Sequence, residues 1–458
     1  MYKRQEGRWY LALVEEVRAN DAYLRVGATR ARMTIVTSTW AAPFDARTGV
    51  NNARIESMLE ALEPGDVVWV RGRFRTLQSG ARSLRTGDEG LPLVELRQVP
   101  RVEASILSSN TVDGRVDVME GGVDYDRSQF NRATLACRQP GSVFKAIYYA
   151  LALDRGRYEV DSILQHVAWV PEPGESWNPR DIEKTPDGRL LLRTAFIKSL
   201  NTPFIRLFLE LGAGAVVEWA RRLGIQSELI ADKALSLGAS CVKMTELSQA
   251  FGVFATNGRR HRLRSYARVA DKHGTTLLDD RPSTASGLNV AGRVRALMRE
   301  TSLGAPQIID ARTAFLTTSM MRDVVRIGTG VRANQIGAPA AGKSGTASKG
   351  DYTTDAWFVG FTSRRLTSAW VGDDRYIRSL GDHEASYTTA TPMWTRFMRR
   401  RSSGLRHTEL PAREPPGIAT RTVDATMGGP PIPGLPSAKI HFATAWTRVR
   451  DPLGFTGP

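Results

Sequence analysis

The most constraining feature of this chain is the apolar run Ala146–Leu153, which directly follows Gly141-Ser142-Val143-Phe144-Lys145. A helix over this run is apolar on every side, so we expect it to be buried. Lys145 then falls in the first turn of a buried helix, where the helix dipole disfavours a cation and a capping box would have Glu or Gln. Burial lowers the pKa of a lysine, which allows it to act as a general base near neutral pH.

Ser142 stands three residues before Lys145, and residues three apart share one face of a helix. This spacing predicts a nucleophilic hydroxyl beside a lysine that can accept its proton. Only ten of the 63 basic residues are lysine, which favours a role that needs a titratable amine. The alternative is structural, because a serine after Pro140-Gly141 is also a good helix N-cap.

A second segment of interest is Ala340–Ser348, in which small residues flank Lys343 and two hydroxyls. Glycines in a strand often mark the close approach of a ligand or another backbone. Strand patterns follow at Asp355–Phe361 and Leu366–Gly372, so the three segments predict an antiparallel meander. Its first strand could take an extended peptide by strand addition, with Lys343 and Thr346 holding a carboxylate. The alternative is a glycine-rich turn with a solvated lysine.

Between these two segments lies a third, Ser199-Leu200-Asn201. On its own this tripeptide indicates only the start of a helix. Thr202-Pro203 would then supply the cap and the proline of the first turn, and Phe204–Glu210 would continue the helix.

Taken in order, Ser-x-x-Lys, Ser-x-Asn and Lys-Ser-Gly-Thr form the motif triple of class A β-lactamases and penicillin-binding proteins. The matching neighbourhoods are Gln129–Thr134 with Arg138-Gln139-Pro140-Gly141, Leu237–Ser240 before Phe254–Gly258, and Ser319–Val325 before Gly328-Thr329-Gly330. Together they resemble the transpeptidase domain of the bifunctional (class A) penicillin-binding proteins. The resemblance implies an α/β (α+β) serine-penicillin-recognising transpeptidase fold, with helices on both sides of a central antiparallel sheet.

The resemblance also implies a function, that of a peptidoglycan D,D-transpeptidase acting through an acyl-enzyme. Ser142 would attack the penultimate D-Ala carbonyl of a stem peptide, and Lys145 would take its proton. Ser199 would relay a proton to the leaving group. Asn201 would orient Lys145 and form a hydrogen bond with the substrate amide. Lys343 would shape the electrostatic field of the site. A β-lactam would acylate Ser142 by the same route.

Substrate binding is assigned, by the same resemblance, to the segment Ser344, Gly345 and Thr346. The hydroxyls of Ser344 and Thr346 would hold the terminal carboxylate of the stem peptide. The backbone N–H groups of Ser142 and Thr346 would form an oxyanion hole.

We expect no metal and no other cofactor. The two cysteines form no C-x-x-C motif, and we interpret Cys137 as a small buried hydrophobe without a catalytic role. The six histidines show no ligand spacing: His166, His261, His273, His383, His407 and His441.

The region before residue 100 predicts a separate, small all-β domain. Strand patterns lie at Trp9–Val14, Ala31–Val36, Val67–Val70 and Leu93–Leu96, with a short helix at Asn51–Leu62. Short strands with a turn and a helix suit an OB-like barrel, and class A penicillin-binding proteins carry such a domain at this place. An OB-fold alone would also fit an oligonucleotide binder, but without an exposed aromatic platform we expect no specific nucleic acid.

The expected division is therefore an OB-like domain at 1–100, a transpeptidase domain at 101–403 and a tail at 404–458. Proline and glycine break every periodic pattern in the last part, which predicts a linker or extended tail.

The net charge of +16 is carried mainly by arginine and allows three interpretations: a solvated surface, attraction to anionic lipid or wall polymer, or nucleic-acid binding. The first is favoured, because the one dense basic run, Arg396–Arg406, suits the charged end of a helix over Pro392–Met398.

The first residues do not form a signal peptide, and no apolar run is long enough to span a membrane. The family normally has a membrane anchor and a glycosyltransferase domain before this point, so we expect a C-terminal part of such a protein. The resemblance implies a periplasmic location, tethered to the inner membrane only by an N-terminal anchor absent here. It implies peptidoglycan stem peptides, β-lactams, and cell-wall synthesis proteins or lipoproteins as partners.

Two alternatives to transpeptidation remain open. A D,D-carboxypeptidase or β-lactamase would send the same acyl-enzyme to water, but the nearest pattern for a deacylating glutamate, Glu172–Asn178, precedes Ser199 instead of following it. A catalytically silent scaffold that binds wall polymer is disfavoured because every motif residue is intact.

Overall fold

The structure is a computed structural model of the chain. It describes residues 9–42, 54–76, 82–84, 86–87, 89–99, 102–171, 173–174, 177–179, 181, 188–279, 289–292, 294, 305–349, 352–376, 379–381, 384–402, 404–405, 409–426, 430–431, 433–434 and 436–443. The chain forms two compact units, one from residues 1–102 and 375–383, the other from 103–374 and 384–458.

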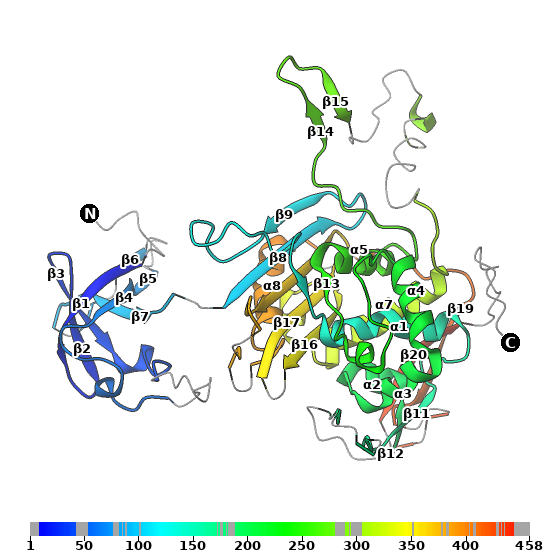
Figure 1. The fold of residues 1–458 in the computed structure, drawn as a ribbon, viewed down its shortest axis with the longest axis horizontal. Helices are drawn as coiled ribbons and strands as arrows, with labels where there is room; N and C mark the ends of the chain where they lie inside the picture. The colour runs from blue at the N-terminus through cyan, green and yellow to red at the C-terminus, as the bar shows by residue number, and fades with distance from the viewer. Residues whose placement is uncertain are drawn as a thin grey trace. The chain divides into compact units, whose positions relative to one another are not determined.

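The first unit is a closed barrel with the strand order β1-β2-β3-β7-β4 (Figure 1). Its strands are β1 Tyr10–Val17, β2 Asp21–Val26, β3 Thr29–Thr34, β4 Val67–Gly72 and β7 Leu93–Arg97, while β5 Phe74–Thr76 and β6 Arg82–Leu84 form a separate hairpin. Ala12, Leu24 and Val70 are among the apolar residues buried in the barrel core. The predicted small barrel at this place is confirmed.

The helix predicted at 51–62 is wrong in the part of it that the structure describes. Residues 51–53 lie outside the described residues, and the rest contains a single 3-10 turn, η2 Met58–Glu60. A capping box starts this turn, since Ser57 Oγ accepts from Leu59 N–H and Glu60 Oε1 accepts from Ser57 N–H. Met58 is fully buried in the barrel core. Tertiary packing therefore overrides the local helix propensity.

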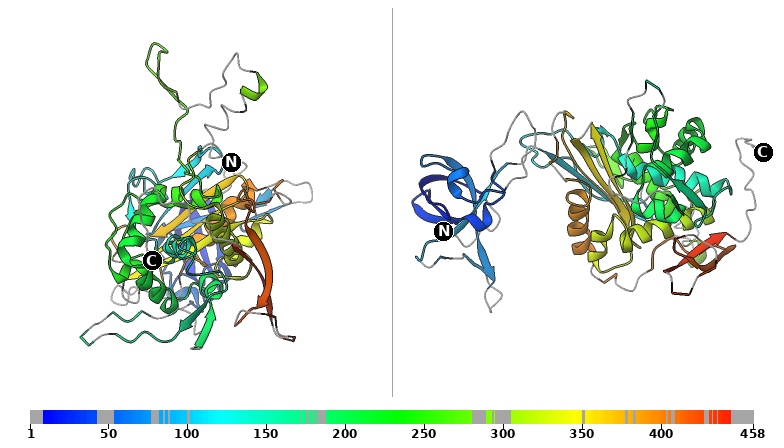
Figure 2. Two further views of the ribbon diagram at one scale, coloured as in Figure 1. Left: turned by 90° about the vertical axis from the view of Figure 1, so that its right-hand side faces the viewer. Right: turned by 90° about the horizontal axis from the view of Figure 1, so that it is seen from below.

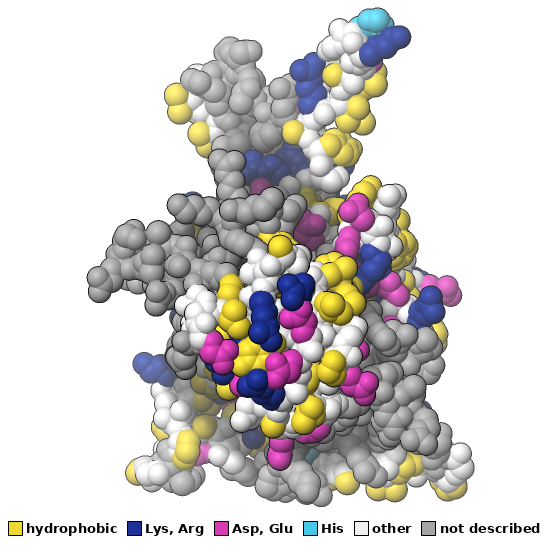
Figure 3. Space-filling view, turned by 90° about the vertical axis from the view of Figure 1, so that its left-hand side faces the viewer, with side chains coloured by type: hydrophobic (Ala, Val, Ile, Leu, Met, Phe, Trp, Pro, Cys, Tyr) yellow, Lys and Arg dark blue, Asp and Glu magenta, His cyan; other side chains and the backbone are white. Residues whose placement is uncertain are grey.

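The barrel surface carries charges of both signs. Figure 3 shows Lys and Arg side chains mixed with Asp and Glu on the face of this unit. Several of them pair: Arg71 Nη2 lies 2.6 Å from Glu95 Oε1, and Arg25 Nε lies 2.5 Å from Glu15 Oε1. On this face the arginines are thus offset by carboxylates, which agrees with a solvated surface.

The second unit is built on a five-stranded antiparallel sheet in the order β16-β17-β18-β8-β9 (Figures 1 and 2). Its strands are β16 Ala341–Lys349, β17 Tyr352–Phe361, β18 Arg365–Gly372, β8 Glu103–Asn110 and β9 Val116–Glu120. The predicted meander of three strands is confirmed, since Lys343 pairs with Val359 and Trp357 pairs with Trp370. β8 and β9 complete the sheet beyond β18.

Helices cover both faces of this sheet, as predicted (Figure 2). The helices are α1 Lys145–Asp154, α2 Leu192–Lys198, α3 Thr202–Leu211, α4 Ala213–Arg222, α5 Met244–Ala255, α7 Ala311–Ile327 and α8 Ala390–Arg401. α8 packs on β17 and β18, where Trp394 donates its Nε1–H to Thr367 O at 3.0 Å. Its last turn carries Arg399, Arg400 and Arg401, so the predicted basic helix end is confirmed. None of the described helices combines the length and apolar character that crossing a membrane requires.

Short elements complete the described structure. In the barrel unit, the 3-10 turn η1 Ile35–Thr37 follows β3, and in the second unit the 3-10 turns are η3 Gly141–Phe144, η4 Lys233–Leu237 and η5 Val331–Ile336. The two-stranded pairs are β10 Cys137–Arg138 with β13 Val242–Lys243, β11 Ile163–His166 with β12 Gly188–Leu191, and β14 Arg268–Ala270 with β15 Thr276–Asp279.

The apolar run after Lys145 forms the fully buried helix that was predicted. Every residue of α1 from Lys145 to Leu153 is buried. The chain enters this helix through η3, and neither η3 nor α1 begins with a side-chain cap. The interpretation of Ser142 as a helix N-cap is therefore wrong.

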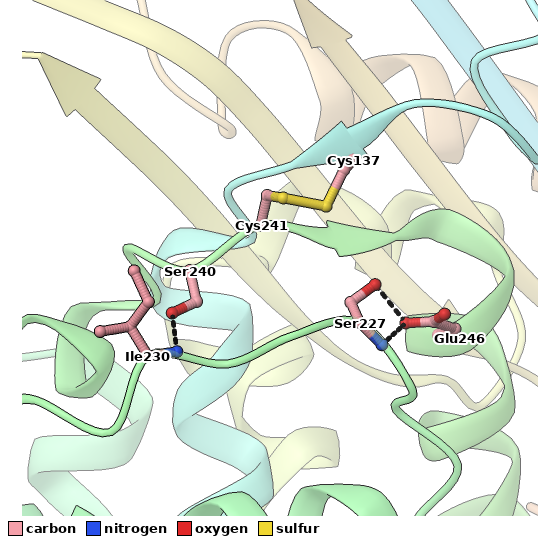
Figure 4. Close-up of a disulfide and its surroundings, with 6 residues drawn as sticks. All are labelled: Cys137, Ser227, Ile230, Ser240, Cys241 and Glu246. Carbon is pink, nitrogen blue, oxygen red and sulfur yellow. Dashed lines mark hydrogen bonds between the residues drawn. A yellow bond between two sulfur atoms is a disulfide. The ribbon is translucent and has the colours of Figure 1, made fainter.

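Cys137 and Cys241 form a disulfide that joins β10 to β13 (Figure 4). Their Cα atoms lie 5.1 Å apart across a sequence separation of 104 residues. Nearby, Ser240 Oγ accepts a hydrogen bond from Ile230 N–H. The interpretation of Cys137 as a small buried hydrophobe is wrong, because Cys137 is only half-buried and the pairing of β10 with β13 brings the two sulfurs together. No local spacing signals this disulfide.

The region predicted as a tail contains a hairpin. β19 Ile418–Asp424 and β20 Ser437–Ala443 pair in antiparallel register, and Val423 and Ile440 belong to the main core of the second unit. Arg421 Nη2 lies 2.5 Å from Asp161 Oδ2. Proline and glycine lie around and between these strands, which is why composition predicted an extended segment although each strand carries buried apolar residues.

Removing the disulfide is expected to lower the free energy of unfolding of the second unit by about 2–4 kcal/mol, because the unfolded chain regains the freedom of a long loop. The measurement is denaturant unfolding of Cys137→Ala/Cys241→Ala against the unchanged chain, followed by tryptophan fluorescence. Reducing agent should move the midpoint of the unchanged chain to that of the double variant and leave the double variant unmoved. Equal midpoints in all samples would contradict a stabilising role.

Candidate active site

Three oxygen atoms surround the amine of Lys145. Its Nζ lies 2.7 Å from Ser199 O, 2.8 Å from Leu200 O and 2.7 Å from Asn201 Oδ1. The lysine comes from the first turn of α1, and its partners come from the turn that joins α2 to α3. The structure therefore brings the first and second sequence motifs together.

The backbone of Ser199 makes this arrangement possible. Ser199 ends α2 with φ 59° and ψ 33°, the left-handed region that residues other than glycine rarely adopt. The turn exposes two successive carbonyls and the Asn201 side chain to Lys145. Lys343, from β16, donates hydrogen bonds to Ser199 Oγ at 2.7 Å and to Ser344 O at 3.0 Å. Ser199 is thus the point at which all three motifs meet.

Both lysine amines are fully buried, and both are easier to deprotonate than ordinary lysines. Burial lowers the pKa of Lys145 to about 7, while the charge of Asp181 raises it in part. Burial lowers the pKa of Lys343 well below its usual value, and the charge of Lys145 lowers it further. The rings of Phe204 and Phe196 lie 5.6 and 5.8 Å from the two Nζ atoms and stabilise what charge remains. The site therefore favours one positive charge over two.

Ser142 lies in η3, which packs directly on β16. The packing is closest at two glycines. A Cβ on Gly345 would lie 2.3 Å from Pro140 O, and a Cβ on Gly141 would lie 2.3 Å from Thr346 O. Gly141 also has φ +53°. The turn η3 and the strand β16 therefore approach to a distance that only glycine allows. Within the described residues, Ser142 Oγ makes no hydrogen bond, so its hydroxyl is not committed to a structural partner.

The hydroxyls of Ser344 and Thr346 lie one residue either side of Gly345, on the same face of β16. Ser344 Oγ lies 2.6 Å from Thr329 Oγ1. Thr346 Oγ1 accepts a hydrogen bond from Ser386 N–H at 3.2 Å. Because the Thr346 oxygen accepts that bond, its own hydrogen is free to donate to an incoming oxygen.

The family comparison decides what kind of site this is. Residues 105–372, more than half of the 458 residues, match the model described as penicillin binding protein transpeptidase domain. The chain belongs to the penicillin-binding protein family. Residues 2–102 match the penicillin-binding protein OB-like domain. The resemblance drawn from the motifs is confirmed, and so is a penicillin-binding transpeptidase fold preceded by an OB-like domain.

Individual relatives agree with this assignment. Penicillin-binding protein 1A from Pseudomonas aeruginosa is 30% identical over 440 residues, which cover 88% of this chain and 50% of the relative. Penicillin-binding protein 1A from Haemophilus influenzae shares the fold with TM-score 0.70 and 24% identity, over 95% of this chain and 63% of that chain. The structure of the PonA1 protein from Mycobacterium tuberculosis in complex with penicillin V matches with TM-score 0.55 and 22% identity. The match covers 70% of this chain and 85% of that chain. This chain spans half or less of the curated relatives' length.

Several polar residues contact the motif residues of this penicillin-binding protein site, although no sequence pattern predicted these contacts. Asp181 and His166 lie behind Asn201, and Ser386 lies behind Thr346. Thr329 belongs to a stretch that matches the family, yet no pattern predicted its contact with Ser344. All four are near the site only because of the fold, so a single sequence could not identify them.

The structure bears only in part on two expectations, the absence of a metal site and the position of a deacylating glutamate. In the part of the chain that the structure describes, no group of three His, Cys, Asp or Glu residues could hold a metal ion. Glu172, the nearest candidate for a deacylating glutamate, lies outside the described residues.

Gly345→Ala is expected to destabilise the second unit by about 1–3 kcal/mol, because the added methyl group would overlap Pro140 O and force the nucleophile segment away from β16. The matched control is Gly214→Ala, within α4 and with open space around its Cα, which should stabilise the chain by about 0.5–1 kcal/mol. Thermal or denaturant unfolding measures both. A Gly345→Ala chain as stable as the unchanged one would refute the close approach.

Proposed function

We propose that this chain is a serine-type D,D-transpeptidase that cross-links peptidoglycan stem peptides through an acyl-enzyme on Ser142. The observation that carries the proposal is the buried amine of Lys145, whose pKa is lowered to about 7, so that it can accept a proton at neutral pH. Its contact with Asn201 Oδ1 at 2.7 Å ties this base to the second family motif. Membership of the penicillin-binding protein family supports the same chemistry.

Acylation begins when Ser142 Oγ attacks the carbonyl carbon of the penultimate D-Ala. The neutral amine of Lys145 takes the hydroxyl proton as the new C–O bond forms. The backbone N–H groups of Ser142 and Thr346 stabilise the oxyanion, an effect worth about 3–4 kcal/mol for a single donor in other enzymes. The C–N bond to the terminal D-Ala then breaks.

The leaving amine receives its proton from Ser199. Lys343 Nζ donates to Ser199 Oγ, so the Ser199 hydrogen can pass to the leaving nitrogen while Lys343 replaces it. Lys145 has by then gained the proton of Ser142, and Lys343 has lost one. The pair of amines keeps one positive charge throughout, so the buried site never holds two charges at once.

Transfer to the acceptor reverses these proton movements. The amine of a neighbouring stem peptide attacks the ester carbonyl and gives its proton through Ser199 to Lys343. The bond from the carbonyl carbon to Ser142 Oγ breaks, and Lys145 returns the proton to the serine. The site is then restored, and the new peptide bond is the cross-link.

The hydroxyls on β16 are placed to bind the donor carboxylate. Thr346 has a free hydroxyl hydrogen because Ser386 N–H occupies its acceptor side, and Ser344 lies on the same strand face. A β-lactam presents a carboxylate and a reactive amide in a similar relation. PonA1, which has the same fold, was solved with penicillin V, and we extend that binding to this chain.

The disulfide supports an extracytoplasmic location for the reaction. Disulfides persist in oxidising compartments such as the periplasm and are rare in the cytosol. Both cysteines of the chain are used in the Cys137–Cys241 pair. A periplasmic enzyme would have stem peptides as its substrates. Cell-wall synthesis proteins or lipoproteins as partners stay a prediction.

A fluorescent penicillin should label the chain covalently, and Ser142→Ala should abolish the labelling because the nucleophile is lost. Ser265→Ala, at an exposed position of the second unit, is the matched control and should label at the unchanged rate. Denaturing gel fluorescence measures both. Labelling of Ser142→Ala would overturn the nucleophile assignment, and label lost within seconds from the unchanged chain would favour a β-lactamase.

The acylation rate should rise about tenfold per pH unit below pH 7 and level off above it, because Lys145 accepts a proton only after losing its own. Lys145→Arg should abolish acylation, since a guanidinium stays protonated. Lys439→Arg, on the exposed part of β20, is the control. Stopped-flow acylation across the pH range measures the profile. A flat profile through neutral pH would assign the base to another group.

A further inference from the structure

The turn that surrounds Lys145 is held from behind by two buried side chains, Asp181 and His166. Asp181 Oδ1 accepts a hydrogen bond from the backbone N–H of Asn201, and Asp181 Oδ2 accepts one from Thr202 Oγ1 at 3.3 Å. His166 Nε2 lies 2.8 Å from Asp181 Oδ2. The side chains of His166 and Asp181 are only 5% and 9% exposed. A buried carboxylate with three partners indicates a fixed position.

Asp181 provides one of the hydrogen bonds that the start of α3 needs, because it accepts from the backbone N–H of Asn201. Asn201 stands at the N-cap position of α3, yet its side chain makes no capping hydrogen bond. Its Oδ1 accepts from Lys145 Nζ instead. The first N–H groups of a helix lack intrahelical partners, and the helix dipole favours a negative charge there. The Asp181 carboxylate accepts from one of these N–H groups, that of Asn201, and places a negative charge at the start of α3.

The left-handed backbone of Ser199 adds a second requirement. Such a conformation persists only where surrounding contacts hold it. Asp181 fixes the chain two residues later, at Asn201, and His166 connects Asp181 to the end of β11. The turn is thereby anchored through the backbone N–H of Asn201.

We propose that Asp181, oriented by His166, is a positioning residue of the active site, which holds the turn from Ser199 to Asn201 so that three oxygens converge on Lys145. This inference rests on the proposed function, since it assigns a task within the same site.

The charge of Asp181 has a second consequence. Burial lowers the pKa of Lys145, and Asp181 opposes that effect by raising it. Among the described residues, the other titratable groups around this pair are Lys343 from β16 and His166 from β11. Asp181 therefore affects both the position of Lys145 and its pKa, on which burial has the larger effect.

Two variants separate these effects. Asp181→Asn keeps an oxygen that can accept from Asn201 N–H but removes the charge, so the acylation profile should move to lower pH and the rate on its acid limb should rise about threefold or more. Its maximal rate should stay within about threefold of the unchanged chain. Asp181→Ala loses the acceptor as well, and its maximal rate should fall roughly 10- to 100-fold as Asn201 and Lys145 are displaced.

The matched control is Asp154→Asn. Asp154 is a partly buried carboxylate at the end of the same helix as Lys145, and it accepts from Thr313 Oγ1 at 2.8 Å. A loss that reflected only the removal of a hydrogen-bonded carboxylate would appear in this control too. We expect neither its maximal rate nor its pH profile to change.

A second readout needs no β-lactam. The ¹³Cε resonance of Lys145 in lysine-labelled protein, assigned by its absence in Lys145→Arg, reports the titration directly. Its midpoint should move to lower pH in Asp181→Asn and stay unchanged in Asp154→Asn. If the unchanged chain takes up no β-lactam, the proposed function fails, while this titration still decides the role of Asp181.

An unmoved Lys145 midpoint in Asp181→Asn, or a maximal rate in folded Asp181→Ala within twofold of the unchanged chain, would overturn the proposal. If Asp181→Ala does not fold, the titration of Lys145 in Asp181→Asn decides alone. A downward shift in Asp181→Asn with a retained maximal rate supports the proposal.

Discussion

The burial of two lysine amines, Lys145 and Lys343, is the constraint on which the rest of the active site depends. A buried ammonium is costly, and two of them close together are costlier still. The protein meets this cost with three oxygens around Lys145 and with the Ser199 hydroxyl and Ser344 carbonyl beside Lys343. These contacts do not fully replace the lost hydration, and burial lowers the pKa of both amines.

Rigid surroundings keep these partners in place. The central sheet supplies Lys343, and its close contact with η3 at Gly141 and Gly345 sets where Ser142 lies. The disulfide joins β10, which leads into η3, to β13, which leads into α5. The turn at Ser199, with its left-handed backbone, is followed by Asn201, whose backbone N–H donates to Asp181. Each support is distant in sequence from the residue that it positions.

Much of the fold could be predicted because it follows local patterns. The uninterrupted apolar run after Lys145 predicted a buried helix, and the strand patterns at 355–361 and 366–372 predicted adjacent strands. Local sequence patterns failed to predict elements whose formation depends on contacts between residues distant in sequence. The strand β2 Asp21–Val26 and the hairpin at 418–443 were missed, since charges interrupt the first and prolines surround the second. The Cys137–Cys241 pair was missed because it spans 104 residues.

The sequence alone determined which residue types stand in the three motifs, in what order, and that one lysine enters a helix with no polar face. These are properties of neighbours along the chain, so spacing and composition report them. Only the tertiary structure decided that Ser199 adopts a left-handed backbone, that Lys343 reaches its hydroxyl, and that Asp181 and His166 stand behind Asn201. These contacts form between segments that are distant in sequence and meet only after folding. Burial and the surrounding polar groups then determine the pKa of each titratable side chain.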